Sequence, residues 1–411
     1  MPTHLIGLLL GTEEDWSAAY ETLMARVAPR ISHGGATHDF ALERVTIEPF
    51  DLRMKPRHKL VIDRLAHWYY VPREWVKKVA LMDDVYLMNN PFTFQAMEKH
   101  SAYCAMMRLG LKVPDTWLIP HKQPPADERF AYTAQHYNRP FDLAAIAQQI
   151  SYPLFMKPFD GGAWVGVSRI KDAQELARRY DESGQRLMHL QKAVDGFDVF
   201  VRSLSIGAET MVMHFQPDRP LHDSYMVDHE FLDAELGAEA ITLGRTINAF
   251  FRWEFNSCET LVKGGEQYPI DYANACPDVS LISLHYYFPW AIRTLLKWSV
   301  YCCVTDRPMR VELEPQPWFE IGDSDRSYEE KLAEYRRLAD DYFEVDAYEE
   351  FMAEHLPDLD ELLVEYIESP EFDRLLVETV TRAFPPHEHE KFVGHYRGLL
   401  AAWASDQHAA A

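Results

Sequence analysis

Apolar residues in the first 320 positions of this 411-residue chain occur in short runs that end at glycine, proline or polar turns. HLIGLLLG, at residues 4–11, is typical of a buried strand, whereas EDWSAAYETLMARV, at residues 14–27, repeats apolar positions at helical spacing. Because strand-like and helix-like segments alternate, the pattern predicts a mixed α/β chain. A single core stops growing near about 250–300 residues, so this length predicts more than one domain.

Composition and charge exclude several functional classes. No run of about 18 apolar residues occurs, and the segment MPTHLIGLLLGTEEDW lacks the basic start of a signal peptide, so we expect neither membrane insertion nor secretion. Five cysteines in so long a chain do not make a disulfide framework, which favours the reducing cytoplasm. A net charge of -23 without a cluster of basic and aromatic residues argues against nucleic acid as a partner.

Residues 1–93 are expected to form a small parallel α/β layer. After the opening strand and helix, residues 44–52 and 84–90 are typical of further strands, and residues 58–71 are typical of a helix between them. Gly7 and Gly11 do not make a dinucleotide fingerprint, because no GxGxxG sequence follows the strand.

A second domain is expected at residues 94–320, with a smaller lobe at about 120–190 and a larger one at about 191–320. Apolar runs joined by glycine turns favour hairpins, and therefore antiparallel sheets. The polar, proline-rich stretch at residues 120–140 is predicted to be a surface loop or lid.

Residues 321–411 are expected to form an acidic helical extension. Between Glu320 and Asp373 there are 20 acidic residues against 4 basic ones, and the segments that follow Ser327 have amphipathic spacing. This region could cover a lobe, form an oligomer interface or recognise a basic partner, and the sequence does not choose among these.

Lys157 lies inside the apolar segment YPLFMKP and precedes a glycine-rich turn with Gly161, Gly162 and Gly166. An ammonium group is costly to bury unless it meets anionic oxygens, and glycines let backbone N–H groups approach a phosphate. The combination indicates a phosphate-binding lid. The alternative is a surface hairpin whose lysine extends to water.

Oxygen-bearing side chains stand on both arms of a predicted hairpin that turns at Gly264–Gly265. Glu259 lies on the first arm, and Asp271 and Asn274 lie on the second. Cross-strand neighbours are ~5 Å apart, so these side chains could share one hard cation such as Mg²⁺, with Glu254 as a further candidate ligand. The alternative is a solvated hairpin with an Asx turn at Asn274.

The order of these pieces resembles the ATP-grasp superfamily over roughly residues 85–280. Lys99 precedes LGLKVPDT, Lys157 lies in YPLFMKPFDGGAWVGV, and the segment LQKAVDGFD follows. Glu259 then stands 12 positions before Asp271, and NACP completes the pattern. The resemblance implies a two-lobed ATP-grasp core of antiparallel sheets between the N-terminal α/β domain and the acidic extension.

The resemblance also implies a role for each matching residue. Lys99 and Lys157 would bind the ATP phosphates, with the loop from Gly161 to Gly166 closing over them. Arg202 would position phosphate or an acyl phosphate. The residues implied to contact adenine and ribose are Gln191, Lys192, Ala193, Val194 and Asp198. The implied ligands of Mg²⁺, with Mn²⁺ as the alternative ion, are Glu259, Asp271 and Asn274.

The metal motif departs from the family pattern, which is usually E-x-N. This chain has D-x-x-N, with Tyr272 where the glutamate would stand, so Asp271 is one position early and one methylene shorter. A β-bulge at residues 272–273 would turn the carboxylate towards Glu259. The family also often has a basic residue where this chain has Phe200.

The activity that the resemblance implies is an ADP-forming ligase, which makes an acyl phosphate from a carboxylate and joins it to the amine of an amino acid or small peptide. Candidate ligands for the substrate carboxylate are Arg252, His229 and Arg245. The alternatives are a degenerate nucleotide-binding scaffold or regulatory protein without ligase activity, and an ATP-grasp phosphotransferase. The expected partners are small molecules, and the oligomeric state stays open.

Overall fold

The computed structural model describes residues 3–93, 98–137, 139–162, 164–274 and 276–410. Contacts divide the chain into two compact units. The first unit comprises Met1–Gln95, Val201–Ser257 and Ala275–Ala411, and the second comprises Ala96–Phe200 and Cys258–Asn274. None of the described helices is long and apolar enough to cross a membrane.

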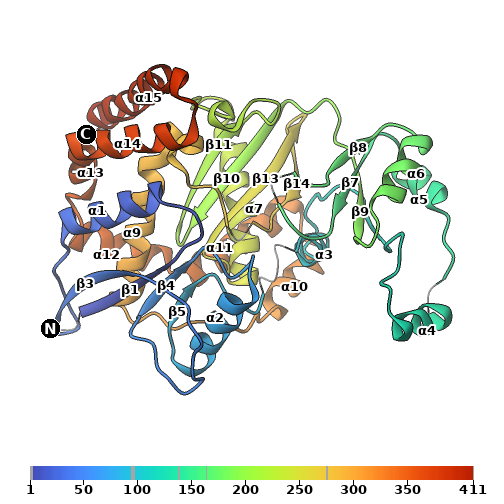
Figure 1. The fold of residues 1–411 in the computed structure, drawn as a ribbon, viewed down its shortest axis with the longest axis horizontal. Helices are drawn as coiled ribbons and strands as arrows, with labels where there is room; N and C mark the ends of the chain where they lie inside the picture. Colours follow the sequence, from blue (N-terminus) through green and yellow to red (C-terminus); the bar gives the residue numbers. More distant parts are fainter. Residues whose placement is uncertain (1–2, 94–97, 138, 163, 275, 411) are drawn as a thin grey trace. The chain divides into compact units, whose positions relative to one another are not determined.

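The first unit contains the expected parallel α/β layer (Figure 1). Its sheet has the order β2-β3-β1-β4-β5, and all neighbours are parallel except β2 and β3. The strands are β1 (Thr3–Leu9), β2 (Ile31–His33), β3 (Ala36–Arg44), β4 (Leu60–Asp63) and β5 (Tyr86–Met88). The helices of this layer are α1 (Asp15–Val27) and α2 (Tyr70–Met82).

Two sequence predictions in this layer are wrong. Residues 58–71, predicted to be a helix, contain β4 and only the first residues of α2. β4 lies between β1 and β5 in the sheet, and all residues of its apolar run Leu60–Ile62 are buried. The run therefore lacks the alternation of apolar and polar residues that marks a half-exposed strand. Of residues 44–52, predicted to be a strand, only Arg44 belongs to a strand, as the last residue of β3.

A second five-stranded sheet has the order β12-β11-β10-β13-β14, and the division between the units falls within β10 and β13. Its strands are β10 (Val199–Ile206), β11 (Glu209–Phe215), β12 (Tyr225–Met226), β13 (Phe255–Lys263) and β14 (Glu266–Asp271). Gly207 makes the tight turn between β10 and β11 with φ +55°, and a Cβ there would lie 2.0 Å from Cδ2 of Trp298. Only glycine fits this turn without displacing the indole.

Helices make up the rest of the first unit. The central ones are α7 (Ala234–Phe251) and α9 (Phe288–Val304), and α9 is buried on nearly every side. The C-terminal helices are α10 (Gln316–Gly322), α11 (Tyr328–Phe343), α12 (Val345–His355), α13 (Leu359–Ile367), α14 (Pro370–Ala383) and α15 (His389–Ala410). The short segments are α8 (Leu281–Leu284), η1 (Leu221–Asp223), η2 (His285–Tyr287) and η3 (Pro386–Glu388).

The acidic C-terminal helices cover helices of their own unit. α13 packs on α1 and α9, and α14 packs on α1 (Figure 1). Ion pairs cross this contact, with Arg26 2.7 Å from Glu371 and Arg293 2.8 Å from Asp360. Part of the acidic charge is therefore offset by arginines of the helices beneath it.

The second unit is built on an antiparallel sheet with the order β6-β9-β7-β8. Its strands are β6 (Thr116–Ile119), β7 (Leu154–Pro158), β8 (Ser168–Ile170) and β9 (Met188–Lys192). The helices are α3 (His100–Arg108), α4 (Glu128–Tyr137), α5 (Leu143–Ile150) and α6 (Ala173–Glu182). α4 lies inside the stretch at residues 120–140 that was predicted to be a surface loop or lid. The β13–β14 hairpin also belongs to this unit from residue 258 onward.

Candidate functional site

The β13–β14 hairpin carries the two carboxylates predicted to bind a metal. Glu259 pairs with Asp271, and the register shifts just beyond this pair, so that Ile270 is an extra residue in β14. An extra residue reverses the face that the following side chain meets. The bulge therefore lies at Ile270, instead of at the predicted residues 272–273, and it places Asp271 directly opposite Glu259.

Lys99, at the start of α3, contacts this hairpin through its side chain. It is the N-cap residue of the helix, and its side chain is buried. Its ammonium nitrogen lies 3.0 Å from Oδ2 of Asp271 and donates to the carbonyl oxygen of Gly161 at 2.5 Å. One lysine thus contacts both the β14 carboxylate and the glycine-rich loop.

Lys157 lies in the middle of the sheet and is also buried, with only 8% of the residue exposed. The alternative of a surface lysine extending to water is therefore wrong. Its ammonium donates to Oε1 of Gln191 at 2.8 Å and to the carbonyl oxygen of Ile270 at 3.3 Å. Burial lowers the pKa of Lys157 to about 8, against the opposing effect of Asp271 and Glu259, because desolvation disfavours the charged form.

The sequence did not predict that three polar residues, Gln191, Thr116 and Tyr103, would lie around Lys157 and Ile270. Gln191, predicted to line adenine, accepts from Lys157 and donates through Nε2 to Oγ1 of Thr116 at 2.9 Å. Tyr103 donates its hydroxyl to the carbonyl oxygen of Ile270 at 2.7 Å. Tyr103 stands four residues after Lys99, on the same helix face, which is the sequence signal that could have identified it.

The loop between β7 and β8 has the backbone that its glycines allow. Gly161 and Gly166 have φ values of +85° and +78°. A Cβ at Gly166 would lie 2.9 Å from Cγ of Pro158, whereas a Cβ at Gly161 would meet open space. The intervening Trp164 and Val165 are exposed, so the described part of the loop, which also includes Gly162, presents both backbone and apolar side chains at the surface.

The end of β9 carries the other residues predicted to bind the nucleotide. The backbone N–H of Lys192 donates to Asp115 and that of Ala193 donates to Pro153, while Val194 is half-buried. Asp198 is exposed and accepts from the backbone N–H of Gly264 at 2.7 Å, so its carboxylate holds the turn of the β13–β14 hairpin. Lys192 and Asp198 keep their side chains near the surface.

The predicted metal ligands fit a hard cation by their chemistry. Glu259 and Asp271 are adjacent on paired strands, and Asn274 follows three residues after the end of β14. All three offer oxygen donors, the kind that Mg²⁺ prefers. Among the described residues no group of three or more histidine, cysteine, aspartate or glutamate side chains could hold a metal ion, so the amide is needed to complete the set.

Arg202 belongs to the first unit, where it lies on β10. Its guanidinium carbon is 5.0 Å from the ring centroid of Phe215 and 5.8 Å from that of Tyr225. The structure thus places this predicted phosphate ligand among aromatic rings of its own sheet.

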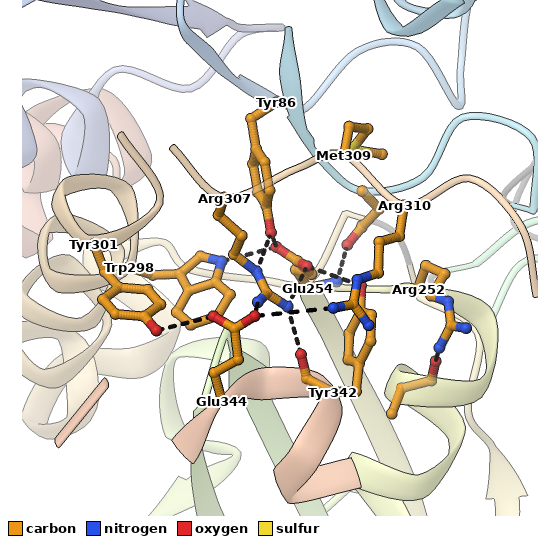
Figure 2. Close-up of polar contacts among 12 residues, drawn as sticks. Tyr86, Arg252, Glu254, Trp298, Tyr301, Arg307, Met309, Arg310, Tyr342 and Glu344 are labelled. Atoms are coloured by element: carbon orange, nitrogen blue, oxygen red, sulfur yellow. Dashed lines mark hydrogen bonds and ion pairs between the residues drawn. The ribbon is translucent and has the colours of Figure 1, made fainter. Parts of the chain in front are cut away.

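Glu254, considered as a further metal ligand, is a buried acceptor in the first unit (Figure 2). Tyr86 and Trp298 donate to its Oε2 at 2.5 and 2.8 Å, and Tyr342 donates to its Oε1 at 2.9 Å. Nη2 of Arg307 lies 3.9 Å from the same carboxylate. Its oxygens are bound by side chains of the unit, and the structure does not support the ligand hypothesis.

The residues proposed for a substrate carboxylate also have partners in the first unit. Their contacts are the Glu312 carbonyl oxygen for Arg252 at 2.9 Å, the Asp340 carboxylate for Arg245 at 2.9 Å, and the Tyr286 hydroxyl for His229 at 3.2 Å. These contacts orient the three side chains within the unit's own framework.

No protein-family model and no curated protein matches the chain. Among solved structures, it is similar to a RimK domain protein ATP-grasp from Sphaerobacter thermophilus, with 15% identity, a TM-score of 0.45, and coverage of 67% of this chain and 93% of that one. It is also similar to the D-alanine–D-alanine ligase of Bacillus anthracis complexed with ATP, with 13% identity, a TM-score of 0.47 and coverage of 73% and 98%. The ligase from Helicobacter pylori has 14% identity, a TM-score of 0.38 and coverage of 58% and 72%.

These similarities concern the fold and say nothing of this chain's substrate. The first of the matched structures carries the name of the superfamily that the sequence motifs resemble. The chain itself has the mixed α/β fold, with parallel and antiparallel sheets, that the resemblance implies.

Proposed function

We propose that this chain is an ATP-dependent ligase, which forms an acyl phosphate from a small carboxylate and joins it to an amine with release of ADP and phosphate. The observation that carries the proposal is the meeting of two buried lysines with two facing carboxylates, Lys99 and Lys157 with Glu259 and Asp271. Phosphoryl transfer needs positioning and charge neutralisation more than covalent chemistry, and this set provides both.

The lysines bind the nucleotide's phosphates. Lys157 is desolvated, so a phosphate oxygen stabilises its ammonium more than it would stabilise an exposed one. Gln191 and Thr116 orient Lys157, and the loop from Gly161 to Gly166 covers the phosphates with its backbone N–H groups.

Glu259, Asp271 and Asn274 would hold Mg²⁺ or Mn²⁺. The ion supplies positive charge to phosphate oxygens on which negative charge accumulates. Lys99, which contacts Asp271 in the structure, would pair with phosphate when the nucleotide is bound, and Asp271 would then pair with the cation. Each of these charges would keep an opposite partner.

The remaining predicted residues complete the nucleotide and substrate contacts. Backbone groups from Gln191 to Val194 line the adenine, and Asp198 contacts the ribose. Arg202, which belongs to the first unit, keeps only the acyl-phosphate role that the sequence resemblance implies. The substrates are a small carboxylate and an amino acid or small peptide. Their joining through an acyl phosphate requires no nucleophilic side chain of the protein.

The test is incubation with MgATP and pooled carboxylates and amines, with ADP, AMP and phosphate measured alongside product masses. A ligase releases ADP and phosphate only when both substrates are present, and yields an amide. Phosphate retained on a product would point to a phosphotransferase, and saturable ATP binding without turnover under any pool would point to a scaffold.

Variants test the site separately from the reaction. Lys157→Ala and Asn274→Ala should each abolish turnover while the far-ultraviolet circular dichroism stays unchanged. Lys112→Ala is the matched control, because Lys112 lies in the same unit but pairs with Glu266 at an exposed position, 3.0 Å away. Near-normal rates in both site variants would refute the site assignment.

A further inference from the structure

Helix α2 carries an exposed apolar face that its own unit leaves uncovered. Its inner side packs in the core through Trp75, Val76 and Val79. On the outer side, Tyr70 is 77% exposed and Leu81 is 65% exposed. The α2 face comprises Tyr70, Glu74, Lys77 and Leu81, and the exposed residues Tyr69 and Met82 flank it at the two ends of the helix.

Neighbouring residues extend this face into a patch. Trp68 and Val71 are 55% and 58% exposed, and Leu52 and Met54 are 60% and 61% exposed. Lys78 of α2 donates to the carbonyl oxygen of Met54, which ties the loop that carries Leu52 and Met54 to the helix. Exposed apolar side chains gathered on one helix and on the loop bound to it are typical of an interaction site.

The pattern of apolar and charged positions on the α2 face reads the same from either end of the helix. Tyr70, Glu74, Lys77 and Leu81 follow the spacing i, i+4, i+7, i+11, so they line one side of the helix. Read from either end, the line is apolar, charged, charged, apolar, and the two charges are opposite. Rotation by a two-fold axis that passes between residues 75 and 76 exchanges the two ends.

We propose that α2 is the interface of a two-fold symmetric homodimer, with the α2 helices of the two copies packed antiparallel. In this register Tyr70 of one copy lies opposite Leu81 of the other. Glu74 lies opposite Lys77 of the other copy, and the symmetry makes this pair twice. A two-fold interface requires such self-complementarity, because each residue meets a partner that it also serves.

Charge and area both suit a second copy as the occupant. The chain carries a net charge of -23, but the α2 face bears one acid and one base, so two copies can approach here without like-charge repulsion. The three exposed aromatic residues contribute roughly 400 Å² of surface. The exposed aliphatic side chains add an area of the same order, so the ~800 Å² per partner of a standard interface would be reached only if the whole patch were buried.

The oligomeric state of the full chain tests the proposal directly. Sedimentation equilibrium should give a mass near twice the 47.8 kDa of one chain. Tyr70→Ser and Leu81→Ser should each shift the equilibrium towards monomer, with an unchanged circular dichroism spectrum. About 100 µM is well above the dissociation constant expected of a standard interface. A wild-type chain that stays monomeric up to this concentration would overturn the proposal and leave the patch to another partner.

A charge-reversal experiment tests the register. Glu74→Lys sets two like-charged pairs across the interface, as does Lys77→Glu, so each variant alone should dimerise on the order of 100-fold more weakly. In a mixture, one variant contributes a lysine at both positions and the other a glutamate at both. Both pairs across the interface then join opposite charges, and the heterodimer should form with near wild-type affinity. Within each chain the ion pair between these positions, 2.9 Å in the structure, stays broken, so recovery reports only the contact between chains.

The matched control is Glu334→Lys, which reverses the same charge in an exposed i,i+3 pair on α11, where Glu334 lies 3.1 Å from Arg337. It should leave dimerisation unchanged. Failure of the mixture to recover, or equal weakening by the control, would overturn the antiparallel α2 interface.

Discussion

Replacing Glu254 with glutamine should destabilise the first unit strongly, and the cluster in Figure 2 gives the reason. Glu254 is 4% exposed, and its carboxylate accepts three hydrogen bonds, from Tyr86, Trp298 and Tyr342. It also lies 3.9 Å from the Arg307 guanidinium, whose side chain is 2% exposed. Glutamine keeps the shape but removes the charge and one acceptor oxygen.

The expected loss follows from the two kinds of contact. Breaking a buried ion pair by neutralising one partner costs about 3–5 kcal/mol, because a charge stays buried without its counterion. Arg307 also lies 2.7 Å from Glu344, and the remaining amide oxygen can accept from both Tyr86 and Trp298, so the loss falls near the lower limit. We expect Glu254→Gln to lower the free energy of unfolding by about 3 kcal/mol.

Urea denaturation followed by tryptophan fluorescence measures this loss, since Trp298 belongs to the cluster. Glu344→Gln is the control in the same network, because a third of that side chain is exposed and its contacts should contribute about 1 kcal/mol or less. A loss below about 1 kcal/mol for Glu254→Gln, together with weaker metal binding, would refute the structural role and restore Glu254 as a ligand.

Three further predictions concern the site and the core. Because burial lowers the pKa of Lys157 to about 8, the lysine loses its charge above that pH, and kcat/KM for ATP should fall there. Lys157→Arg should extend the plateau to higher pH, and an identical profile would contradict this reading. Asp271→Asn should weaken Mn²⁺ binding at least about tenfold in titrations followed by electron paramagnetic resonance, without any turnover being needed. Gly207→Ala should cost about 3 kcal/mol or more, because the new Cβ meets Trp298, whereas Gly34→Ala, with a similar φ of +57° and open space, should cost about 1 kcal/mol.

The hairpins of this chain were predictable because their signals are local. β13 and β14 turn at Gly264–Gly265, which have φ values of +58° and +78° as a tight turn requires. β4 was not predictable in this way. Its burial depends on β1 and β5, which lie far away in the sequence, and three consecutive apolar residues suit a buried helix as well as a buried strand.

The same distinction between local and long-range signals applies to the residues of the candidate site. The sequence could identify Lys99, Lys157 and the glycine loop, because each belongs to a motif of contiguous residues. It could not identify the role of Gln191 in orienting Lys157, since that contact depends on the pairing of β7 with β9. Side chains that act through a cross-strand neighbour become visible only when the register is known.

The extra residue at Ile270 brings the carboxylate of the D-x-x-N sequence opposite Glu259, although the family pattern is usually E-x-N. In a regular strand, moving a carboxylate one position along the chain turns it to the opposite face. Here the bulge adds one residue before Asp271, so the side chain returns to the face of Glu259 and stands opposite it. The displaced Ile270 carbonyl oxygen meanwhile accepts from both Lys157 and Tyr103. The bulge therefore places the carboxylate of Asp271 and the acceptor of Lys157 together, and under the proposed function this coupling gives a reason for the altered spacing.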